Sequence, residues 1–252
     1  MGCMWIVQFC FGLLFGSFSN VLIDRLESGE SVLWGRSHCD YCKKTLRWYE
    51  LIPVVSFLIQ FGKCRRCHRS LSLQYPLIEL VTAFGYVLLY TTIPFGLAYI
   101  AAAAIYSASI VMLVADYKYQ IIPDEMVGIG SIASIIYVLM TKQDASSIVL
   151  HGASAIGAVS FFYALWYGTK GKGMGFGDVK LSAMLGLLLG YPGILFALYT
   201  AFLTGALVGV ILILTKNKTL KSKIAFGPFL LLGLLVAVVF DRQLIQVWNI
   251  YF

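Results

Sequence analysis

Residues 181–215 read LSAMLGLLLGYPGILFALYTAFLTGALVGVILILT, a run of 35 residues without Asp, Glu, Lys, Arg or His. A transmembrane helix needs about 20 consecutive apolar residues, so the run is much longer than one crossing requires. Its only interruption is Gly190-Tyr191-Pro192-Gly193, and glycine and proline in this arrangement favour a tight turn. The run therefore predicts two membrane-spanning helices joined by a turn.

The same apolar character extends along the whole chain of 252 residues. Hydrophobic residues make up 60% of it and charged residues 12%, against roughly 25% charged residues in an ordinary soluble domain. This composition excludes a soluble enzyme and a disordered chain. Because backbone polar groups in lipid must be satisfied internally, we expect an all-α polytopic membrane protein with about eight transmembrane helices. The apolar runs lie at residues 5–23, 77–93, 95–115, 126–140, 148–167, 179–189, 193–215 and 225–240.

The positive charges gather on one side of these predicted crossings. By our count, 17 of the 19 Lys and Arg residues fall in alternate loops, at residues 24–76, 116–125, 168–180 and 216–224. The opposite side carries only Lys142 and Arg242. The positive-inside rule therefore predicts a multi-pass protein of the bacterial cytoplasmic membrane with the basic loops in the cytoplasm and both termini outside. The net charge of +7 is explained by this topology, so we expect the lipid bilayer and no nucleic acid as a partner.

The chain divides into three predicted parts. Residues 1–23 form the first transmembrane helix, which we expect to be retained because it lacks the basic start and the small-residue cleavage site of a signal peptide. Residues 24–76 form the one soluble-like unit, and residues 77–252 form a membrane domain of several helices. The final residues 244–252 contain Trp248 and other aromatic residues, which suits either an interfacial segment or a frayed tail.

Four cysteines of the 24–76 loop are spaced as two metal-binding knuckles: Cys39, Cys42, Cys64 and Cys67. Such pairs can place four thiolates on one tetrahedral Zn²⁺. Two disulfides and free thiols are the alternatives, but a cytoplasmic loop is in a reducing compartment. We predict a structural zinc site, because four thiolates leave no open position for water and a short loop needs the metal to fold. His68 is expected at the surface, and Cys3 and Cys10 are expected to pack as small apolar residues.

Two acidic residues stand at the ends of different apolar runs. Asp116 follows residues 110–115, and Asp178 ends Gly175-Phe176-Gly177-Asp178 just before the run at 179–189. Acids at a membrane border are costly and usually functional. The crossing count puts both on the same side, where two neighbouring carboxyls cannot easily both ionise. This is the arrangement of an aspartic protease, in which one carboxylate activates water and the protonated partner hydrogen-bonds the scissile carbonyl.

Other residues near these acids have open interpretations. Gly173, Gly175 and Gly177 either let a substrate strand approach closely or form a flexible linker. Asp124 either stabilises the start of the next helix or assists the acid pair. Glu79 either stabilises a helix N-terminus or contacts a ligand.

Taken together, these motifs resemble the type IV prepilin peptidase family of membrane aspartic peptidases, over nearly the whole chain. The motifs, in order, are Gly16-Ser17-Phe18-x-Asn20-Val21 with Arg25, the four cysteines, Trp48-x3-Ile52-Pro53-x2-Ser56, Tyr75-Pro76-x2-Glu79, Asp116 with Ile122-Pro123-Asp124, Gly175-x-Gly177-Asp178-x-Lys180-Leu181, and Phe226-Gly227-Pro228-Phe229.

The resemblance implies a function for several of these residues. Asp116 and Asp178 would be the catalytic pair, and the substrate would be a type IV prepilin or competence pseudopilin precursor that loses a short basic leader. Many family members also methylate the new N-terminus with S-adenosylmethionine. The residues that hold this cofactor are unknown, with Gly62, Glu79 and residues 16–20 as candidates. Glu27 departs from the family pattern, which often has proline at this position. The departure affects the inference of methylation and not that of peptidase activity.

Two other classes of protein share some of these features. An ion-coupled secondary transporter also carries membrane-level acids and helices interrupted by Gly and Pro. Its acids should lie nearer the middle of the bilayer, and its two halves should be related by internal symmetry, which this sequence lacks. A zinc-containing membrane scaffold without catalysis would explain the four cysteines alone.

Overall fold

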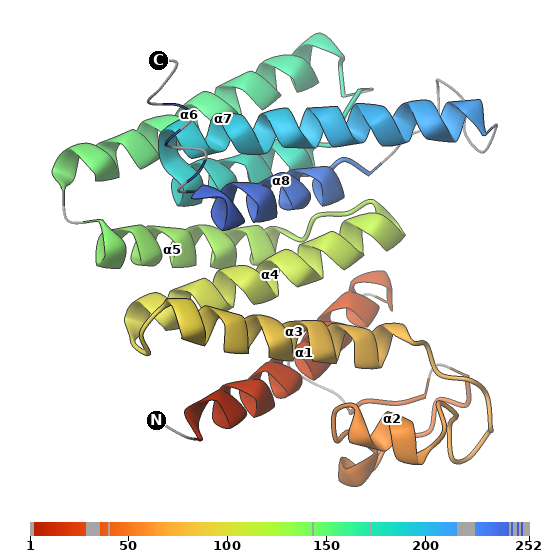
Figure 1. The fold of residues 1–252 in the computed structure, drawn as a ribbon. Coiled ribbons are helices and arrows are strands. Elements are labelled where there is room, and N and C mark those ends of the chain that lie inside the picture. Colours follow the sequence, from red (N-terminus) through yellow and green to blue (C-terminus); the bar gives the residue numbers. More distant parts are fainter. Residues whose placement is uncertain are drawn as a thin grey trace. The chain divides into compact units, whose positions relative to one another are not determined.

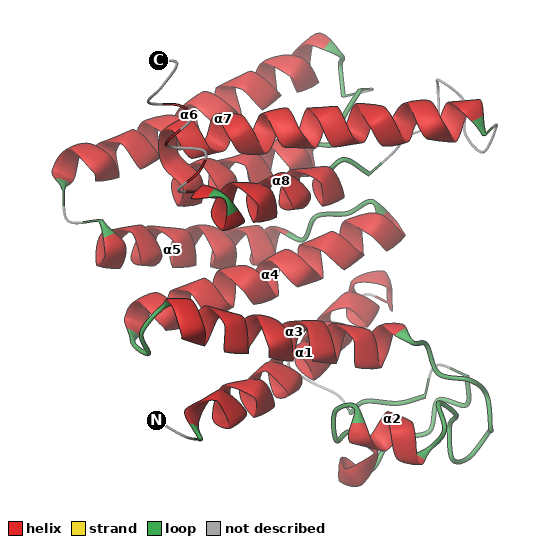
Figure 2. Ribbon diagram, in the orientation of Figure 1, coloured by secondary structure: helices red, strands yellow, loops and turns green. Residues whose placement is uncertain are grey.

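A computed structural model of the chain describes residues 3–28, 36–39, 41–142, 144–171, 173–215, 225–241, 243, 246 and 248. Within these residues, the regular structure is helical (Figures 1 and 2), which confirms the predicted all-α class. The elements are α1 (Met4–Ser28), the 3-10 turn η1 (Trp48–Glu50), α2 (Val55–Ile59), α3 (Gln74–Thr92), α4 (Leu97–Tyr119), α5 (Asp124–Thr141), α6 (Ala145–Gly168), α7 (Phe176–Leu214) and α8 (Gly227–Val239). They form two compact units, Met1–Val111 and Met112–Phe252. The predicted three-part organisation stays a prediction.

In the first unit, α1 packs against α3 through glycines that bring the two backbones close together. A Cβ atom added to Gly12 would lie 2.5 Å from the Cα of Ala83, and one added to Gly16 would lie 2.7 Å from the Cα of Glu79. Small residues allow this kind of close approach between helices in a membrane. The first helix is therefore fitted to α3 and is longer than predicted, since it continues to Ser28.

In the second unit, α5, α6 and α8 each pack against α7. Gly186 of α7 meets α6 closely, because a Cβ atom there would lie 2.5 Å from the Cα of Ala155. The buried ring of Phe162 stacks on Phe202 with 6.0 Å between centroids, and Phe202 in turn contacts Phe226 at 5.1 Å. These rings from α6, α7 and the segment before α8 form an aromatic cluster around the buried Phe162.

The long helix α7 contains a sharp break. The backbone leaves helical geometry at Gly190 (φ 62°, ψ −174°) and Tyr191 (φ −92°, ψ 138°), and Pro192 follows. Only glycine adopts such a positive φ readily, and proline supplies no N–H to continue the helix. Figure 1 shows the chain reversing direction here. The predicted turn is thus confirmed, and the two predicted spans on either side are the two halves of α7.

Five helices in the described part of the chain are long and apolar enough to cross a membrane, namely α1, α4, α5, α6 and α7. The expectation of about eight spans is confirmed only in part. α3 is less apolar because its 19 residues include Gln74, Glu79 and three tyrosines. α8 has 13 residues, about 20 Å at 1.5 Å per residue, which is less than the ~30 Å hydrocarbon core.

Several predictions concern residues that the structure does not describe. The basic segment 216–224, Lys172, Arg242, most of residues 244–252 and the side chain of Glu27 all lie outside the described residues. Orientation in the membrane, which was inferred partly from these charges, therefore stays a prediction. Trp248 is described, and its ring contacts Tyr191 and Phe196 with centroid distances of 5.2 and 6.1 Å.

Candidate active site and metal site

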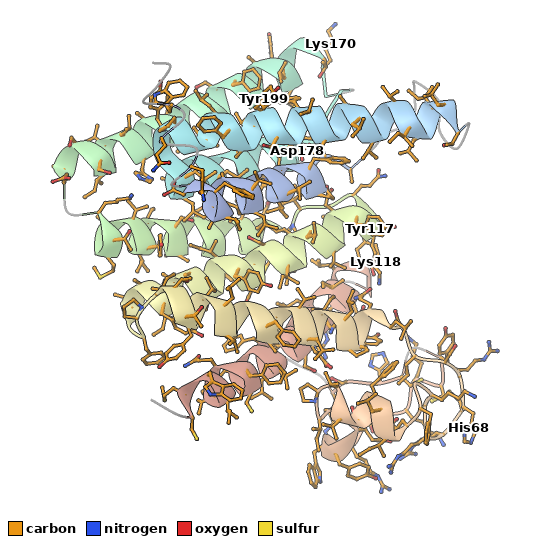
Figure 3. All side chains as sticks on the ribbon, in the orientation of Figure 1. His68, Tyr117, Lys118, Lys170, Asp178 and Tyr199 are labelled. Atoms are coloured by element: carbon orange, nitrogen blue, oxygen red, sulfur yellow. The ribbon has the colours of Figure 1, made fainter. Side chains whose placement is uncertain are left out.

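Asp116 lies near the end of α4, where its carboxyl group is buried. The N–H of Gly227, the first residue of α8, donates a hydrogen bond to Oδ2 of Asp116 at 2.9 Å. The first N–H groups of a helix have no partner within the helix and attract negative charge. The start of α8 therefore holds the Asp116 carboxyl in place. The next residues, Tyr117 and Lys118, are exposed at the end of α4 (Figure 3).

Asp178 lies in the first turn of α7 and is also buried. Figure 3 shows it on this helix. Gly177, the residue before it, and Gly227, which bonds to Asp116, both lie against Ile122. The structure thus brings together the two acids singled out in the sequence, within one compact unit and with little exposure to water.

Ile122 connects the surroundings of the two acids. A Cβ atom added to Gly177 would lie 3.0 Å from the Cβ of Ile122, and one added to Gly227 would lie 3.3 Å from its Cδ1. The same atom on Gly227 would lie 2.6 Å from Oδ2 of Asp116. Glycine is therefore needed beside each acid, at Gly177 next to Asp178 and at Gly227 next to Asp116. This favours close packing, rather than a flexible linker, as the role of Gly177.

Asp124 lies in the first turn of α5, as the helix-start interpretation predicts, and it also forms an ion pair. Pro123 is the residue before α5, and Asp124 begins the helix. Its Oδ1 accepts a hydrogen bond from Nζ of Lys180 at 2.6 Å. This ion pair joins the start of α5 to the first turn of α7, close in sequence to Asp178. The sequence had indicated Lys180 only as a topological charge and a family motif residue.

The four loop cysteines form one cluster, and each of their sulfur atoms lies within 4.8 Å of the others. Cys39 and Cys64 are buried, and the Sγ atoms of Cys39 and Cys67 are 3.8 Å apart. A tetrahedral zinc site with Zn–S bonds of ~2.3 Å requires S–S distances of about 3.8 Å. All four are free thiols, so the cluster fits a four-thiolate metal site better than two disulfides.

Two similar turns build this cluster. The N–H of Lys43 donates to the carbonyl of Cys39 at 2.8 Å, and the N–H of His68 donates to the carbonyl of Cys64 at 2.9 Å. Lys43 and His68 both have positive φ, 54° and 56°. Backbone N–H groups lower the pKa of the Cys64 thiol to about 7, whereas burial raises the pKa of the Cys39 thiol to about 11.

The remaining cysteine and histidine predictions of this region have mixed outcomes. His68 is exposed on the loop (Figure 3), as predicted. Cys3 and Cys10 are exposed and so do not pack inside the described protein, which corrects the expectation for both. Cys10 lies on α1 and Cys3 just before it, and in a membrane small apolar side chains are stable facing lipid.

A cavity of about 210 Å³ in the first unit separates the cysteine loop from α1 and α3. Glu79 lines it, and its Oε2 accepts a hydrogen bond from the N–H of Val54 at 2.7 Å. Glu79 thus anchors the loop to α3, and its carboxylate is also available to the cavity. Gly62, another candidate, does not line the cavity. Its φ of 65° and its contact with Phe57 give it a structural reason to be glycine.

Comparison with known proteins identifies both halves of the chain. Residues 10–93 match a family profile described as Bacterial Peptidase A24 N-terminal domain, and residues 103–240 match one described as Type IV leader peptidase family. The chain belongs to the type IV leader peptidase family. Asp116, Asp178 and Gly227 all fall within the second match.

Similar curated proteins cover most of the chain. One is the prepilin leader peptidase/N-methyltransferase of Bacillus subtilis (strain 168), 30% identical over 96% of this chain and 97% of the relative. The protein of that name from Myxococcus xanthus (strain DK1622) is 35% identical over 84% of this chain, which spans only 64% of the relative. The one from Pseudomonas aeruginosa is 30% identical over 94% and 90% of the two chains. No solved structure shows a significant match.

Membership of the type IV leader peptidase family settles the broad class of the protein. It is an integral membrane peptidase, which supports the prediction of an enzyme over a transporter or a scaffold. The sequence indicated the acids and the cysteines because their chemistry is distinctive. It did not single out Gly227, Ile122 or Lys180 as neighbours of the acids, since their proximity arises only from the packing of distant segments. The family motifs that contain Gly227, Ile122 and Lys180 were the one feature of the sequence that pointed to these residues.

Proposed function

We propose that this protein is an aspartic endopeptidase that removes a short basic leader from a type IV prepilin or pseudopilin precursor at the cytoplasmic face of the membrane. The observation that carries the proposal is the pair of buried acids Asp116 and Asp178, whose neighbours Gly227 and Gly177 both lie against Ile122 within the matched peptidase region. The names of the relatives support the class of substrate.

The proposed reaction uses one proton shared by the two carboxyls. The ionised carboxyl accepts a proton from water, and the resulting hydroxide oxygen attacks the carbonyl carbon of the scissile peptide bond. The protonated carboxyl hydrogen-bonds to the developing oxyanion. The C–N bond then breaks, and the leaving amine takes a proton from the pair. The Gly227 N–H, bonded to Oδ2 of Asp116, fixes the orientation of that carboxyl throughout and so lowers the cost of reaching the reactive geometry.

The acid pair is tested by Asp116→Asn and Asp178→Asn, made separately. Each substitution keeps the size of the side chain and removes one acid, so we expect cleavage to fall by about 10³-fold or more, because neither water activation nor oxyanion stabilisation survives alone. Precursor cleavage is measured by mass spectrometry in membranes, with Asp144→Asn, an exposed acid before α6, as the matched control. Wild-type cleavage rates in both active-site variants would refute the pair.

For the cysteine loop, we propose that Cys39, Cys42, Cys64 and Cys67 hold one structural Zn²⁺. The support is a set of four free thiols with sulfur atoms within 4.8 Å of one another. The metal would stabilise a loop whose regular structure, in its described part, consists of η1, α2 and two isolated bridges. The orientation in which this loop is cytoplasmic and both termini are outside belongs to the same proposal.

A second candidate activity is N-methylation of the newly exposed amine with S-adenosylmethionine. It is favoured by the cavity beside the cysteine cluster, which contains the carboxylates of Asp24 and Glu79 and the guanidinium of Arg25. These groups could pair with the amine and carboxylate of the cofactor's methionine portion. The relatives are named N-methyltransferases. Mass spectrometry of the cleaved product tests this, since methylation adds one methyl group to the new N-terminus and an unmodified product would contradict it.

A further inference from the structure

The short helix α2 has two different faces. Three residues of the helix and its C-cap line the cavity of about 210 Å³ in the first unit, namely Ser56, Phe57 and Gln60. The other three large side chains, Val55, Leu58 and Ile59, are exposed. Residues spaced by three and four positions lie on one face of a helix. The exposed side chains therefore form one apolar face that is turned away from the cavity.

Two aromatic residues beside α2 are even more exposed. Phe61, two residues after the helix ends, is 89% exposed, and Trp48 is 78% exposed. Trp48 belongs to η1, which packs against α2. Protein surfaces in water rarely gather so many large apolar side chains, and such a gathering marks an interaction site. We refer to these five residues as the α2 surface: Trp48, Val55, Leu58, Ile59 and Phe61.

Contacts within the first unit fix the level of α2 along α1. The N–H of Val54, the N-cap of α2, donates to Oε2 of Glu79 at 2.7 Å. The backbone of Glu79 lies next to Gly16 of α1, since a Cβ atom added to Gly16 would be 2.7 Å from the Cα of Glu79. The candidate membrane span of α1 is Met4–Leu26, so Gly16 lies about 15 Å before its end at 1.5 Å per residue. The start of α2 is therefore beside this span and not beyond it.

At this level an outward-facing side chain meets lipid. Phe18, next to the α1 residues that line the cavity, is itself exposed, as expected of a lipid-facing residue. Interfacial helices bury their apolar face about 5–10 Å into the boundary between headgroups and acyl chains, and tryptophan is enriched at the headgroup level. The α2 surface has the composition and the position of such an element.

The segment that carries the α2 surface is strongly basic. Residues 41–73 contain seven Lys and Arg residues, all exposed, and one acid, Glu50. Four thiolates on one Zn²⁺ would add a net charge of about −2, so positive charge remains in excess. Arg47 and Arg65 lie 6.0 and 5.4 Å from the ring centroid of Tyr49, whose ring contacts Trp48. Positive charge is thus held next to the α2 surface, and it attracts anionic headgroups.

We propose that the α2 surface inserts into the leaflet beside it, and that Arg47, Lys63 and Arg65 bind the phosphate groups of anionic phospholipids. The inference goes beyond the proposed peptidase function and does not depend on it. Because the opposite face of α2 lines the cavity of the first unit, insertion also fixes the position of that wall of the cavity.

A photo-cross-linking experiment tests what covers the α2 surface. p-Benzoylphenylalanine replaces Ile59 or His68 in the full chain, which is reconstituted in lipid nanodiscs. His68 is the control, because it is also exposed on the loop and Figure 3 shows it at the edge away from α1. After irradiation, mass spectrometry should find a phospholipid adduct from position 59 and none from position 68. An adduct from position 59 only with protein, or equal lipid yields from both positions, would overturn the insertion.

A second experiment tests the preference for anionic lipid. Amide hydrogen exchange of residues 55–61 is compared in nanodiscs of phosphatidylcholine alone and of phosphatidylcholine mixed with phosphatidylglycerol. We expect exchange to be about tenfold slower in the mixed nanodiscs, since basic residues are attracted to an anionic surface. Arg47→Gln/Lys63→Gln should lose most of this difference, and Arg47→Lys/Lys63→Arg, the matched control that keeps both charges, should retain it. Equal exchange of the wild type in both nanodiscs, or a full difference in the glutamine variant, would contradict the binding of anionic lipid by these residues.

Discussion

Gly227 fixes the position of the Asp116 carboxyl in two ways. Its N–H group donates a hydrogen bond to the carboxyl, and its lack of a side chain lets the carboxyl approach closely. The N–H donates to Oδ2 of Asp116 at 2.9 Å, and a Cβ atom would lie 2.6 Å from the same oxygen. Gly227→Ala should therefore displace the carboxyl and lower cleavage by about tenfold or more, because small misplacements of a catalytic group are costly. The rate is measured as precursor cleavage in membranes by mass spectrometry.

The control for this substitution is Gly157→Ala, which adds the same methyl group at a site with nothing within 4 Å. Both variants should accumulate in membranes at wild-type levels. If Gly227→Ala cleaves as fast as wild type, the contact with Asp116 does not determine the geometry of the acid. At this scale the sequence predicts which acids matter. It does not predict their hydrogen-bond partner, because Gly227 is 111 residues away from Asp116 along the chain.

At the scale of helices, the break in α7 depends on a buried histidine of α6. His151 lies against Gly190, where a Cβ atom would be 2.8 Å from the imidazole ring. Its Nδ1 and the carbonyl oxygen of Leu187 are 2.9 Å apart, so the ring nitrogen must donate the hydrogen. The break leaves the carbonyls of the preceding turn without their usual helical partners, and His151 satisfies one of them.

His151→Leu should lower the free energy of unfolding by about 1–3 kcal/mol, because it leaves the Leu187 carbonyl buried without a donor. Thermal unfolding in detergent micelles measures the loss. Ser154→Ala is the control. The Ser154 hydroxyl donates to the carbonyl of Leu150 within α6, and this carbonyl keeps its helical backbone hydrogen bond when the hydroxyl is removed. An unchanged melting temperature for His151→Leu would show that water or lipid groups satisfy the carbonyl instead.

The helices also show what sequence patterns can and cannot determine. The turn within 181–215 was predictable, because Gly190 and Pro192 interrupt an otherwise uniform apolar run. The number of spans was harder to predict, since α3 pairs an apolar face with Gln74 and Glu79. The role of Glu79 was not predictable at all. Its partner is the backbone N–H of Val54, in a loop whose path depends on the cysteine cluster.

At the scale of the whole molecule, the two compact units differ in what stabilises them. The second unit, Met112–Phe252, is built from helices packed on α7. The first unit, Met1–Val111, contains in addition the cysteine loop, where the regular structure of the described residues 36–39 and 41–73 is η1, α2 and two isolated bridges. A segment with so little packing of its own would depend on the proposed Zn²⁺ for folding. Removal of the metal should therefore unfold this loop and leave the helices intact.

Thiol labelling measures this directly, because the chain has six cysteines and only Cys3 and Cys10 are exposed. With zinc bound, N-ethylmaleimide should leave the four cluster thiols unmodified, and after treatment with a zinc chelator it should modify all four. The double variant Cys3→Ser/Cys10→Ser, which lacks the two lipid-facing thiols, should show the same change from none to four.

Cys39→Ser and Cys64→Ser should each lower the zinc content and expose the remaining cluster thiols without chelator. Circular dichroism should change little throughout, since η1 and α2 together contribute only eight helical residues. Freshly purified protein that contains no zinc, with the four cluster thiols reactive before chelation, would contradict a structural metal site.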